Sequence, residues 1–555
     1  MILAQMLENI SYCVLQGSLQ QEVSGITEYS GDVKPGMMYC CIRGRHADGH
    51  HLAGEAVRRG AGVLIVERPV VVADSEVTVI QVADTKQTAG LLAAAFYEHP
   101  AEKLLMIGIT GTKGKTTVSY MIQSILQQAG ISCGVIGTNG CSMGEGEIQK
   151  MFHTTPGACV LQKLLADMVA AGCKAAVLEV SSMGLKEKRC SGIVFDYGIF
   201  TNFAPDHIGG AEHSSLEEYL YWKTRLFSQC KKGIVNLEEP VVGEILTKGK
   251  TREWIGYRLH PECASQSCLE KSKIDFAEKE TGLKIQQQFL KRELENRNVK
   301  CQKKIENRAE GAQSFTGENR SITKCCQGIH LNIWTEEDVL GMTFQAVDSK
   351  ASYPIDIQLP MPGLYNAANA LAAITCCLEV GCQEQAVKTA LKQTRVPGRT
   401  EIVGTFHGAK IIVDYAHNAS GLEKLLLSLK TYNPARILCV FGCGGSRSKL
   451  RRTEMGEVSS RLADVIVLTE DNSRDENPED IIDEIRQGMK TDIPCHVVLD
   501  RKAAIAYALE LAGPGDFVVV AGKGHEDYQE KNGVRYPFSD RTVIEGLIYD
   551  AERLL

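Results

Sequence analysis

A glycine-rich segment at residues 110–117, TGTKGKTT, carries residue types that bind nucleotide phosphates. It follows the apolar run LLMIGI and precedes VSYMIQSILQQAG, whose apolar positions recur at helical spacing, so the pattern predicts a strand, a turn and a helix start. Backbone N–H groups at a helix N-terminus can surround anionic oxygens, Lys115 can reach the β- and γ-phosphates, and Thr116 can offer its hydroxyl to Mg²⁺. The segment therefore predicts binding of ATP or GTP.

The spacing of the glycines differs from that of the usual phosphate-binding loop. They stand at Gly108, Gly111 and Gly114, and Ile109 occupies the position where the usual loop has its first glycine. The same physics applies at the altered spacing, because backbone N–H groups at a helix start hold the phosphates. The alternative is an ordinary glycine-rich turn between a strand and a helix.

Two further polar residues are expected close to this loop. Glu179 stands in the apolar run KAAVLEV, and His207 stands in FTNFAPDHIG. Because the carboxyl ends of parallel strands face a common crevice, both side chains are predicted near the nucleotide. A carboxylate and an imidazole there can ligate the metal ions that phosphoryl transfer needs. The alternative is that each hydrogen-bonds its own loop.

The length of 555 residues suggests about three domains. Residues 1–100 mix short strands with an Ala-rich helix, whereas strand and helix patterns alternate over 101–395 and again over 396–555. Such alternation is typical of parallel sheets covered by helices. Residues 259–325 are charged and Gln-rich with weak apolar periodicity, which indicates a solvated insert rather than a partner-binding helix.

Charge and composition argue against several classes of protein. The formal net charge of -7 disfavours a general nucleic-acid binder, which needs a basic surface. No apolar run reaches the length of a membrane span, and the N-terminus lacks a basic segment, so a cytoplasmic protein without membrane insertion is predicted. The 20 cysteines lack paired CxxC modules and are interpreted as reduced, mostly buried thiols.

Nine motifs stand in the order typical of one family, and through them the chain resembles the ATP-dependent Mur ligases of peptidoglycan precursor synthesis. The motifs are GITGTKGKTT, HTTP, LEVSS, FTNFAPDHIG, PGLYNAANALAAI, VPGRTEIV, VDYAHN, FGCGGSR and AGKGHEDYQ. The resemblance implies an α/β fold with three domains, a central P-loop ATPase-like parallel sheet and a Rossmann-like C-terminal domain. Residues 1–100 would bind the UDP-linked substrate, 101–395 ATP, and 396–555 an amino acid.

The opening SGITEYSGDVKPG and the ending GKGHEDYQ are most similar to the tripeptide-forming members of the family. The resemblance implies that ATP, with Mg²⁺, phosphorylates the D-Glu carboxylate of UDP-MurNAc-L-Ala-D-Glu. The amine of a diamino acid then attacks the acyl phosphate, and phosphate leaves. The partners expected are these small molecules, with no nucleic acid, and the protein is expected to be a cytoplasmic monomer.

The resemblance also implies roles for individual residues. The ATP contacts would be Gly111, Thr112, Lys113, Gly114, Lys115, Thr116, Thr117, Asn366, Asn369, Arg399 and Asp414. The contacts to UDP-MurNAc-L-Ala-D-Glu, the acceptor substrate, would be Ser30, Asp48, Gly49, His50, Thr154, Thr155, Ser181 and Arg189. The amino-acid contacts would be Arg452, Asp471, Asn472, Arg474, Gly522 and Glu526. The metal site would use Thr116, Glu179, His207 and Lys223, and the residues closest to the chemistry would be Lys115, Glu179, His207 and Lys223.

Lys223, in YLYWKTRLF, falls where these ligases carry a carbamylated lysine (N6-carboxylysine). An unmodified ammonium would repel Mg²⁺, whereas a carbamate anion can support a metal site. From the residues alone, a lysine on the surface of a helix is the alternative.

The motif DNSR at residues 471–474 bears on the choice of amino acid. Family members that accept meso-diaminopimelate carry a similar DNPR motif, whose Arg can pair bidentately with the distal carboxylate. L-Lysine lacks that carboxylate and would leave Arg474 unpaired, at a cost of roughly 1–3 kcal/mol. The motif therefore favours meso-diaminopimelate over L-lysine.

Several positions depart from the family pattern. Tyr29 and Gly31 flank Ser30 where an Asp and an Arg are expected, and Gly157 follows TTP where an acidic residue is usual. These departures leave two alternatives open. One is a related ligase of the superfamily with a different acceptor, such as a folylpolyglutamate-type enzyme, and the other is a non-catalytic ATP-binding scaffold.

Overall fold

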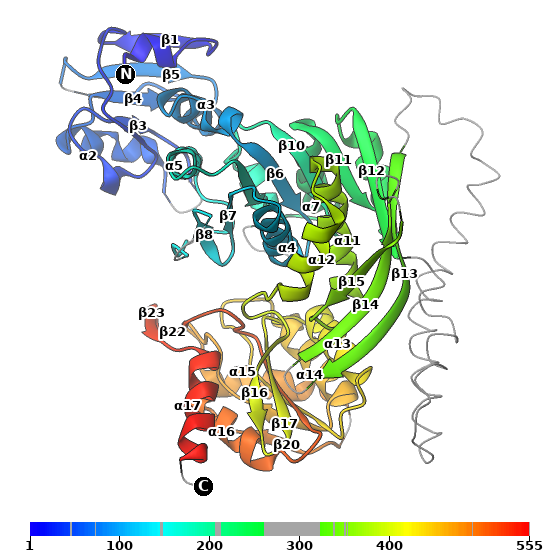
Figure 1. The fold of residues 1–555 in the computed structure, drawn as a ribbon. Coiled ribbons are helices and arrows are strands. Elements are labelled where there is room, and N and C mark those ends of the chain that lie inside the picture. The colour runs from blue at the N-terminus through cyan, green and yellow to red at the C-terminus, as the bar shows by residue number, and fades with distance from the viewer. Residues whose placement is uncertain are drawn as a thin grey trace.

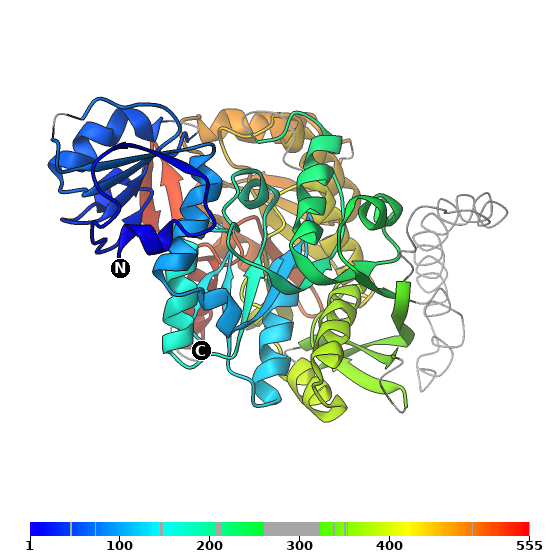
Figure 2. The same ribbon diagram turned by 90° about the horizontal axis from the view of Figure 1, so that it is seen from above.

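Three α/β units follow one another along the chain in the computed structural model (Figure 1). The structure describes residues 1–553 except 45–46, 73, 145–147, 152, 206–211, 260–321, 337–338, 349–350, 352 and 491. His207 and most of the predicted insert lie outside the described residues. The predicted α/β class is confirmed, with the N-terminal unit (blue) and the C-terminal unit (yellow to red) both adjoining the central one (Figures 1 and 2).

The N-terminal unit is a five-stranded sheet in the order β1-β5-β4-β3-β2. Strands β2 to β5 are parallel, and β1 runs antiparallel to β5. The strands are β1 (Tyr12–Gln16), β2 (Ile26–Thr27), β3 (Met38–Cys40), β4 (Val63–Val66) and β5 (Thr78–Val82). The helices are α1 (Leu3–Met6), η1 (Ser30–Asp32), η2 (Gly49–Leu52), α2 (Ala53–Arg58) and α3 (Thr85–Phe96).

The central unit is a ten-stranded sheet in the order β15-β14-β13-β12-β11-β10-β6-β9-β7-β8. The seven strands from β13 to β7 are parallel, and antiparallel strands extend the sheet at both edges. The strands are β6 (Leu105–Thr110), β7 (Cys133–Gly137), β8 (Gly140–Ser142), β9 (Ala175–Glu179), β10 (Phe195–Phe200), β11 (Cys230–Asn236), β12 (Glu253–Leu259), β13 (Ile322–Glu336), β14 (Val339–Val347) and β15 (Ile355–Leu359).

Helices cover both faces of the central sheet. Apolar side chains of α4, α11 and α12 pack in one core, and those of α5 and α8 pack in another. The helices are η3 (Pro100–Lys103), α4 (Lys115–Gln128), α5 (Ala158–Ala170), α6 (Ser182–Lys186), α7 (Leu216–Thr224), η4 (Arg225–Ser228), α8 (Val242–Lys248), α11 (Leu364–Val380) and α12 (Glu384–Gln393).

The C-terminal unit is a six-stranded sheet in the order β16-β17-β21-β18-β19-β20, followed by a hairpin. Helices α13 to α15 pack on one face, and α16 and α17 pack on the other. The strands are β16 (Glu401–Phe406), β17 (Ala409–Asp414), β18 (Ile437–Phe441), β19 (Val465–Leu468), β20 (Cys495–Val497), β21 (Phe517–Ala521), β22 (Tyr528–Lys531) and β23 (Val534–Pro537). The helices are α13 (Ala419–Lys430), α14 (Leu450–Leu462), α15 (Pro478–Gln487), α16 (Arg501–Leu511) and α17 (Asp540–Glu552).

The direction of strand order changes at β6, which lies between β9 and β10. The chain leaves β6 through α4 toward β7 and β9 on one side, and β10 then pairs with β6 on the other side. Ile109 of β6 is opposite Glu179, and Thr110 is opposite Phe200. Because ligands of open parallel sheets bind at the carboxyl edge where the strand order reverses, this edge is the expected site.

Polar contacts join the three units. Lys86 of α3 pairs with Glu187 beyond α6, which ties the N-terminal unit to the central one. The Tyr432 hydroxyl donates to the carbonyl of Gly341 at 2.7 Å, which ties the C-terminal unit to β14. Lys150 also pairs with Asp527 of the C-terminal unit. The central unit is therefore in polar contact with both of the other units.

Two predictions from composition can be compared with the fold. Every cysteine that the structure describes is a free thiol, and most are buried. No helix in the described part of the chain combines the length and the apolar character that a bilayer crossing requires.

Candidate active site

The predicted phosphate-binding loop joins β6 to α4. Gly111 and Gly114 have φ angles of +144° and +86°, in the region that favours glycine. A Cβ atom on Gly114 would lie 2.4 Å from Oδ1 of Asn369. The Lys115 ammonium donates to the carbonyls of Gly111 and Thr112 at 2.8 and 3.2 Å. The loop is thus a compact turn that places the N-terminus of α4 and a lysine side by side.

Glu179 lies directly beside this loop. Glu179 is the last residue of β9 and is almost fully buried, with 1% of the residue exposed. Oε2 accepts from the Thr116 hydroxyl at 3.0 Å, and the two carboxylate oxygens accept from the N–H and hydroxyl of Thr138 at 3.0 Å. Carboxylate and hydroxyl oxygens are the donors that Mg²⁺ prefers. The structure therefore brings together two of the four predicted metal ligands, and the chemistry of the donor set fits the ion.

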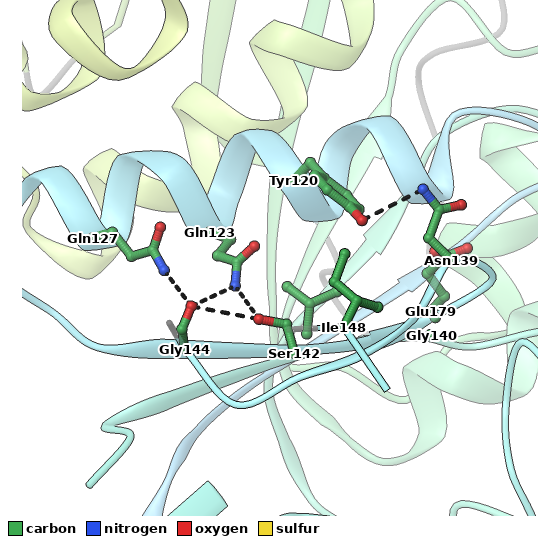
Figure 3. A pocket seen from close by; sticks show the side chains of 11 residues that line it. Tyr120, Gln123, Gln127, Asn139, Gly140, Ser142, Gly144, Ile148 and Glu179 are labelled. Atoms are coloured by element: carbon green, nitrogen blue, oxygen red, sulfur yellow. Dashed lines mark hydrogen bonds between the residues drawn. The ribbon is translucent and has the colours of Figure 1, made fainter. Parts of the chain in front are cut away.

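A cavity of about 200 Å³ adjoins Glu179 between α4 and the β7–β8 hairpin (Figure 3). Tyr120 and Gln123 of α4 line it, facing Asn139 and Ser142 of the hairpin. Hydrogen bonds of 3.4 Å from Asn139 to Tyr120 and of 3.2 Å from Gln123 to Ser142 span it. The cavity is a lateral extension of the site at Glu179.

Lys223 reaches the same loop from α7. Only 1% of this residue is exposed, and its Nζ donates to the carbonyl of Gly111 at 2.7 Å. The same nitrogen lies 4.4 Å from the centre of the Tyr219 ring. Lys223 is therefore a buried lysine beside the phosphate-binding loop rather than one on the helix surface. His207, the remaining predicted metal ligand, lies outside the described residues.

Four predicted acceptor residues of the central unit form one cluster beside Glu179. The Thr155 hydroxyl donates to the carbonyl of Glu179 and accepts from the N–H of Ser181, both at 2.9 Å. Arg189 donates to the carbonyl of Thr155 at 2.8 Å. The Thr154 hydroxyl lies 3.1 Å from that of Thr138. Thr138, which was not predicted from the sequence, thus links the cluster of predicted acceptor residues to the carboxylate of Glu179.

A carboxylate of the N-terminal unit enters this cluster. A Cβ atom on Gly157 would lie 1.5 Å from Oε1 of Glu28, so glycine is the residue that leaves room for it. This Oε1 atom is shielded from solvent and has no hydrogen-bond partner among the described residues. Burial raises the pKa of Glu28 to about 7, against the opposing effects of Arg189 and the N–H of Ala158. Sequence reasoning identified the departure at Gly157 but not the residue that fills the space.

The other predicted acceptor residues lie in short helical turns of the N-terminal unit. Ser30 begins η1 and Gly49 begins η2. The ring of His50 accepts from the N–H of Glu67 at Nε2, so Nδ1 carries the proton that Asp48 accepts at 2.7 Å. Asp48 and His50 are thereby held as a pair.

The predicted ATP residues of α11 lie against the phosphate-binding loop. Asn369 contacts Gly114, and its Nδ2 donates to Oδ1 of Asn366 at 3.3 Å. The Asn366 amide donates to the carbonyl of Pro362 at 2.7 Å. Both asparagines are buried, so their amides are fixed by these contacts.

Tyr365 of the same helix connects to the C-terminal unit. Its hydroxyl lies 3.2 Å from that of Thr400, whose N–H donates to Asp414 at 2.7 Å. Burial raises the pKa of Asp414, whereas the Arg399 guanidinium and hydrogen bonds from Thr400 and Ala416 oppose the shift. Chain contacts thus run from the phosphate-binding loop through α11 to two predicted ATP residues of the C-terminal unit.

Four predicted amino-acid contacts meet at the carboxyl end of β21. The Asn472 amide donates to Oε2 of Glu526 at 2.9 Å. Gly522 has a φ of +114°, and a Cβ there would lie 2.6 Å from Oδ2 of Asp471. The Tyr415 hydroxyl donates to the other oxygen of Glu526 at 3.3 Å.

The two predicted arginines differ in exposure. Arg474 has a backbone φ of +52°. Its side chain is 22% exposed and donates a hydrogen bond to the carbonyl of Gly445. That of Arg452 is 1% exposed and is enclosed by Glu476 and Glu484 at 2.9 and 2.7 Å. Arg474, whose Nε also lies 3.8 Å from Glu530, is therefore partly open to solvent, whereas Arg452 braces the neighbouring loop.

Comparison with protein families and relatives identifies three matched regions. Residues 22–97 match the Mur ligase family, catalytic domain, residues 109–301 match the Mur ligase middle domain, and residues 398–524 match the Mur ligase, glutamate ligase domain. The UDP-N-acetylmuramoyl-L-alanyl-D-glutamate–2,6-diaminopimelate ligase of Chlorobaculum tepidum is 35% identical over 94% of this chain and 92% of its own. Ligase 1 of the same name from Clostridium acetobutylicum is 34% identical over 99% of both chains.

Solved structures match over similar lengths. A structure of UDP-N-acetylmuramoyl-L-alanyl-D-glutamate–2,6-diaminopimelate ligase superposes with a TM-score of 0.63 and 25% identity, covering 99% of both chains. The MurF ligase from Thermotoga maritima in complex with ADP has a TM-score of 0.56 and 16% identity, covering 96% of this chain and 98% of that one. The second similarity concerns the fold alone.

The contact between Gly114 and Asn369 makes the first prediction. In Gly114→Ala, the left-handed backbone costs about 1–2 kcal/mol, and the new methyl group displaces Asn369. We expect ATP affinity, measured by calorimetry with Mg²⁺, to fall by about tenfold or more. Gly130→Ala is the matched control at the other end of α4, because its φ is +78° but nothing lies within 4 Å of the added methyl group. Wild-type affinity in Gly114→Ala would contradict the assignment.

The raised pKa of Glu28 makes the second prediction. Its folded-state pKa of about 7 exceeds the ordinary 4.5, so the folded protein binds more protons between these values and wild-type stability falls as pH rises through them. Glu28→Gln carries no titrating group at this position, so its stability should not fall in this way. We expect its free energy of unfolding to match that of wild type near pH 4.5 and to exceed it above pH 7, by up to about 3 kcal/mol. Glu22→Gln, an exposed carboxylate of the same unit, should change stability equally at both pH values. Equal stability of Glu28→Gln and wild type at high pH would contradict the burial of this carboxylate.

Proposed function

The chain belongs to the Mur ligase family, and from that premise we propose that it joins meso-diaminopimelate to UDP-MurNAc-L-Ala-D-Glu with the energy of ATP. It is an ATP-dependent ligase of peptidoglycan precursor synthesis. The observation that carries the proposal is the meeting of the phosphate-binding loop, Glu179 and the acceptor cluster around Thr155 at one sheet edge.

The proposed reaction consists of a phosphoryl transfer followed by an acyl transfer. An oxygen of the acceptor's D-Glu carboxylate attacks the γ-phosphorus of ATP, and ADP leaves. The amine of the diamino acid then attacks the acyl carbon, loses a proton, and expels inorganic phosphate as the amide forms. Direct condensation of a carboxylate with an ammonium is unfavourable in water, so the phosphoryl group supplies the leaving group. Most of the rate enhancement then comes from positioning and charge neutralisation.

Each part of the loop region has a role in this scheme. Backbone N–H groups from Gly111 to Thr117 and the ammonium of Lys115 bind the triphosphate. Thr116 and Glu179, with His207 and the carbamate of Lys223, would hold Mg²⁺, which neutralises charge on the transferring phosphoryl group. Arg189, Thr154, Thr155 and Ser181 orient the dipeptide end of the acceptor, while Ser30, Asp48, Gly49 and His50 form its uridine-nucleotide end.

The nucleotide is held from both sides. Asn366 and Asn369 approach it from α11, and Arg399 and Asp414 approach it from the C-terminal unit. A site built from two units excludes water when both engage the ligand, which protects an acyl phosphate from hydrolysis.

The amino-acid end is charged to suit a diamino dicarboxylate. Arg474 can pair bidentately with the distal carboxylate, and Glu526 can accept from the distal ammonium. Asp471, Asn472 and Gly522 form the rest of this end, and Arg452 supports it through Glu476, which also accepts from the N–H of Ser446. The enzyme acts in the cytoplasm as a monomer on small-molecule substrates.

The proposed function is tested by phosphate release from ATP and Mg²⁺ with UDP-MurNAc-L-Ala-D-Glu as acceptor. We expect release to depend on meso-diaminopimelate and to be weak with L-lysine or no amino acid, because L-lysine offers Arg474 no distal carboxylate. Arg474→Gln should lose most of this preference, since about 1–3 kcal/mol of the discrimination comes from that pair. Preference for L-lysine would keep the ligase and discard the role of Arg474. No release with either amino acid would point to another acceptor or to a scaffold.

Lys223 provides a separate test of the metal site. We expect Lys223→Ala to lower turnover by about 100-fold or more, because the anionic carbamate would be lost, and a short carboxylic acid such as acetate should restore part of the activity. Lys163→Ala, on the exposed surface of α5, is the control and should behave as wild type with and without acetate. Full activity of Lys223→Ala would remove this lysine from the mechanism.

A further inference from the structure

Lys523 is a buried cation that the proposed mechanism does not use. It lies between Gly522 and Gly524, directly after β21, and its side chain is 0% exposed. Burying an ammonium is costly unless several acceptors replace its water. The groups around Lys523 must therefore replace the water that its ammonium loses on burial.

Those groups all belong to the amino-acid end of the site. The Lys523 ammonium donates to Oδ1 of Asn472 at 3.0 Å and to Oε2 of Glu526 at 3.2 Å. Oδ1 of Asp471 lies 4.0 Å from the same nitrogen. One buried lysine thus touches three of the residues assigned to the diamino acid.

These contacts fix the orientation of the Asn472 amide. Its Oδ1 accepts from Lys523 and also from the N–H of Glu530, each at 3.0 Å. An ammonium and a backbone N–H have only protons to offer, so the amide nitrogen must point the other way. That nitrogen donates to Oε2 of Glu526 at 2.9 Å, which in turn fixes the glutamate.

The charge of Lys523 matters as much as its geometry. Asp471 and Glu526 are carboxylates on either side of it, and close carboxylates in a buried setting repel each other. The ammonium offsets this repulsion and makes the site less negative by one charge. A net-cationic ligand such as L-lysine therefore loses attraction to the site, whereas a net-neutral ligand such as meso-diaminopimelate has no net charge on which this change acts.

We propose that Lys523 is a positioning and specificity-determining residue, which fixes Asn472 and Glu526 for the amino-acid substrate and disfavours net-cationic diamino acids. The inference rests on the proposed function, because it concerns the same amino-acid site. It adds a residue that touches the ligand-binding groups rather than the reacting atoms.

The test compares wild type with Lys523→Met in the phosphate-release assay at saturating ATP and acceptor. We expect the KM for meso-diaminopimelate to rise by about tenfold or more, with kcat and the KM values for ATP and acceptor within about twofold of wild type. The ratio of kcat/KM for L-lysine to that for meso-diaminopimelate should rise, because the site has lost a positive charge. An unchanged KM for meso-diaminopimelate, or an equal loss in all parameters, would overturn the proposal.

Two further variants separate positioning from general stability. Arg436→Met removes the ion pair with buried Asp516 at the opposite end of β21, and should lower stability without changing the KM or the amino-acid preference. Lys523→Arg keeps the charge with a different geometry, and decides the question if Lys523→Met does not fold. It should raise the KM for meso-diaminopimelate but keep the preference over L-lysine, and wild-type behaviour in it would overturn the positioning role. Wild-type turnover with meso-diaminopimelate reports on the proposed function itself, and its absence with every diamino acid would overturn both.

Discussion

The buried carboxylate of Glu179 is the interaction on which the rest of the site depends. Its oxygens bind the hydroxyl of Thr116 in the phosphate-binding loop and both polar groups of Thr138 after β7, while its carbonyl holds Thr155 of the acceptor cluster. The residues proposed to bind the nucleotide, the metal and the acceptor therefore all contact one residue at the end of β9. A buried carboxylate is tolerated there because N–H and O–H donors replace its water. The parallel sheet makes this arrangement possible, since β6, β9 and β10 deliver their carboxyl ends to one edge.

A second constraint is that the proposed nucleotide site is built from two units of the chain. Gly114 lacks a side chain where Asn369 approaches, and the same helix sends Tyr365 to Thr400 beside Asp414. The interior of α11 is dominated by alanine and other small residues, which lets it lie close to α4 and the sheet in one core. The small residues of α11 thus allow its polar residues to contact both the loop and the C-terminal unit, so the proposed ATP contacts depend on the placement of that unit.

Local pattern in the sequence predicts where residues such as Lys115 and Glu179 stand in strands, turns and helices, but it does not reveal contacts between residues that are distant in the chain. The strand, turn and helix around Lys115 and the position of Glu179 at a strand end follow from periodicity, and the α/β class follows from the alternation of elements. Thr138, Glu28 and Lys523 were missed, because each acts through contacts with residues far along the sequence or, for Lys523, through burial that no pattern reveals. Lys523 stands within a motif that was recognised, so the missing information was three-dimensional. The burial of Lys223 is a similar case, since a single lysine on a helix of mixed polarity has no signal of its own.

The proposed amino-acid end and the proposed acceptor end each contain a buried charged group, Lys523 and Glu28, but the surroundings of these two groups differ. At the proposed amino-acid end, Lys523 donates hydrogen bonds to the side-chain oxygens of Asn472 and Glu526. Its charge is therefore compensated without a ligand, and these side chains are held in place. At the proposed acceptor end, Oε1 of Glu28 has no hydrogen-bond partner in the described part of the chain, although Arg189 and the N–H of Ala158 at the start of α5 lie near this carboxylate. Burial raises the pKa of Glu28 because no cation or donor group compensates the whole of its lost hydration, although Arg189 and the N–H of Ala158 oppose the shift. The two proposed ends therefore differ in kind, because the charge of Lys523 is compensated by neighbouring oxygens, whereas the charge of Glu28 is compensated only in part.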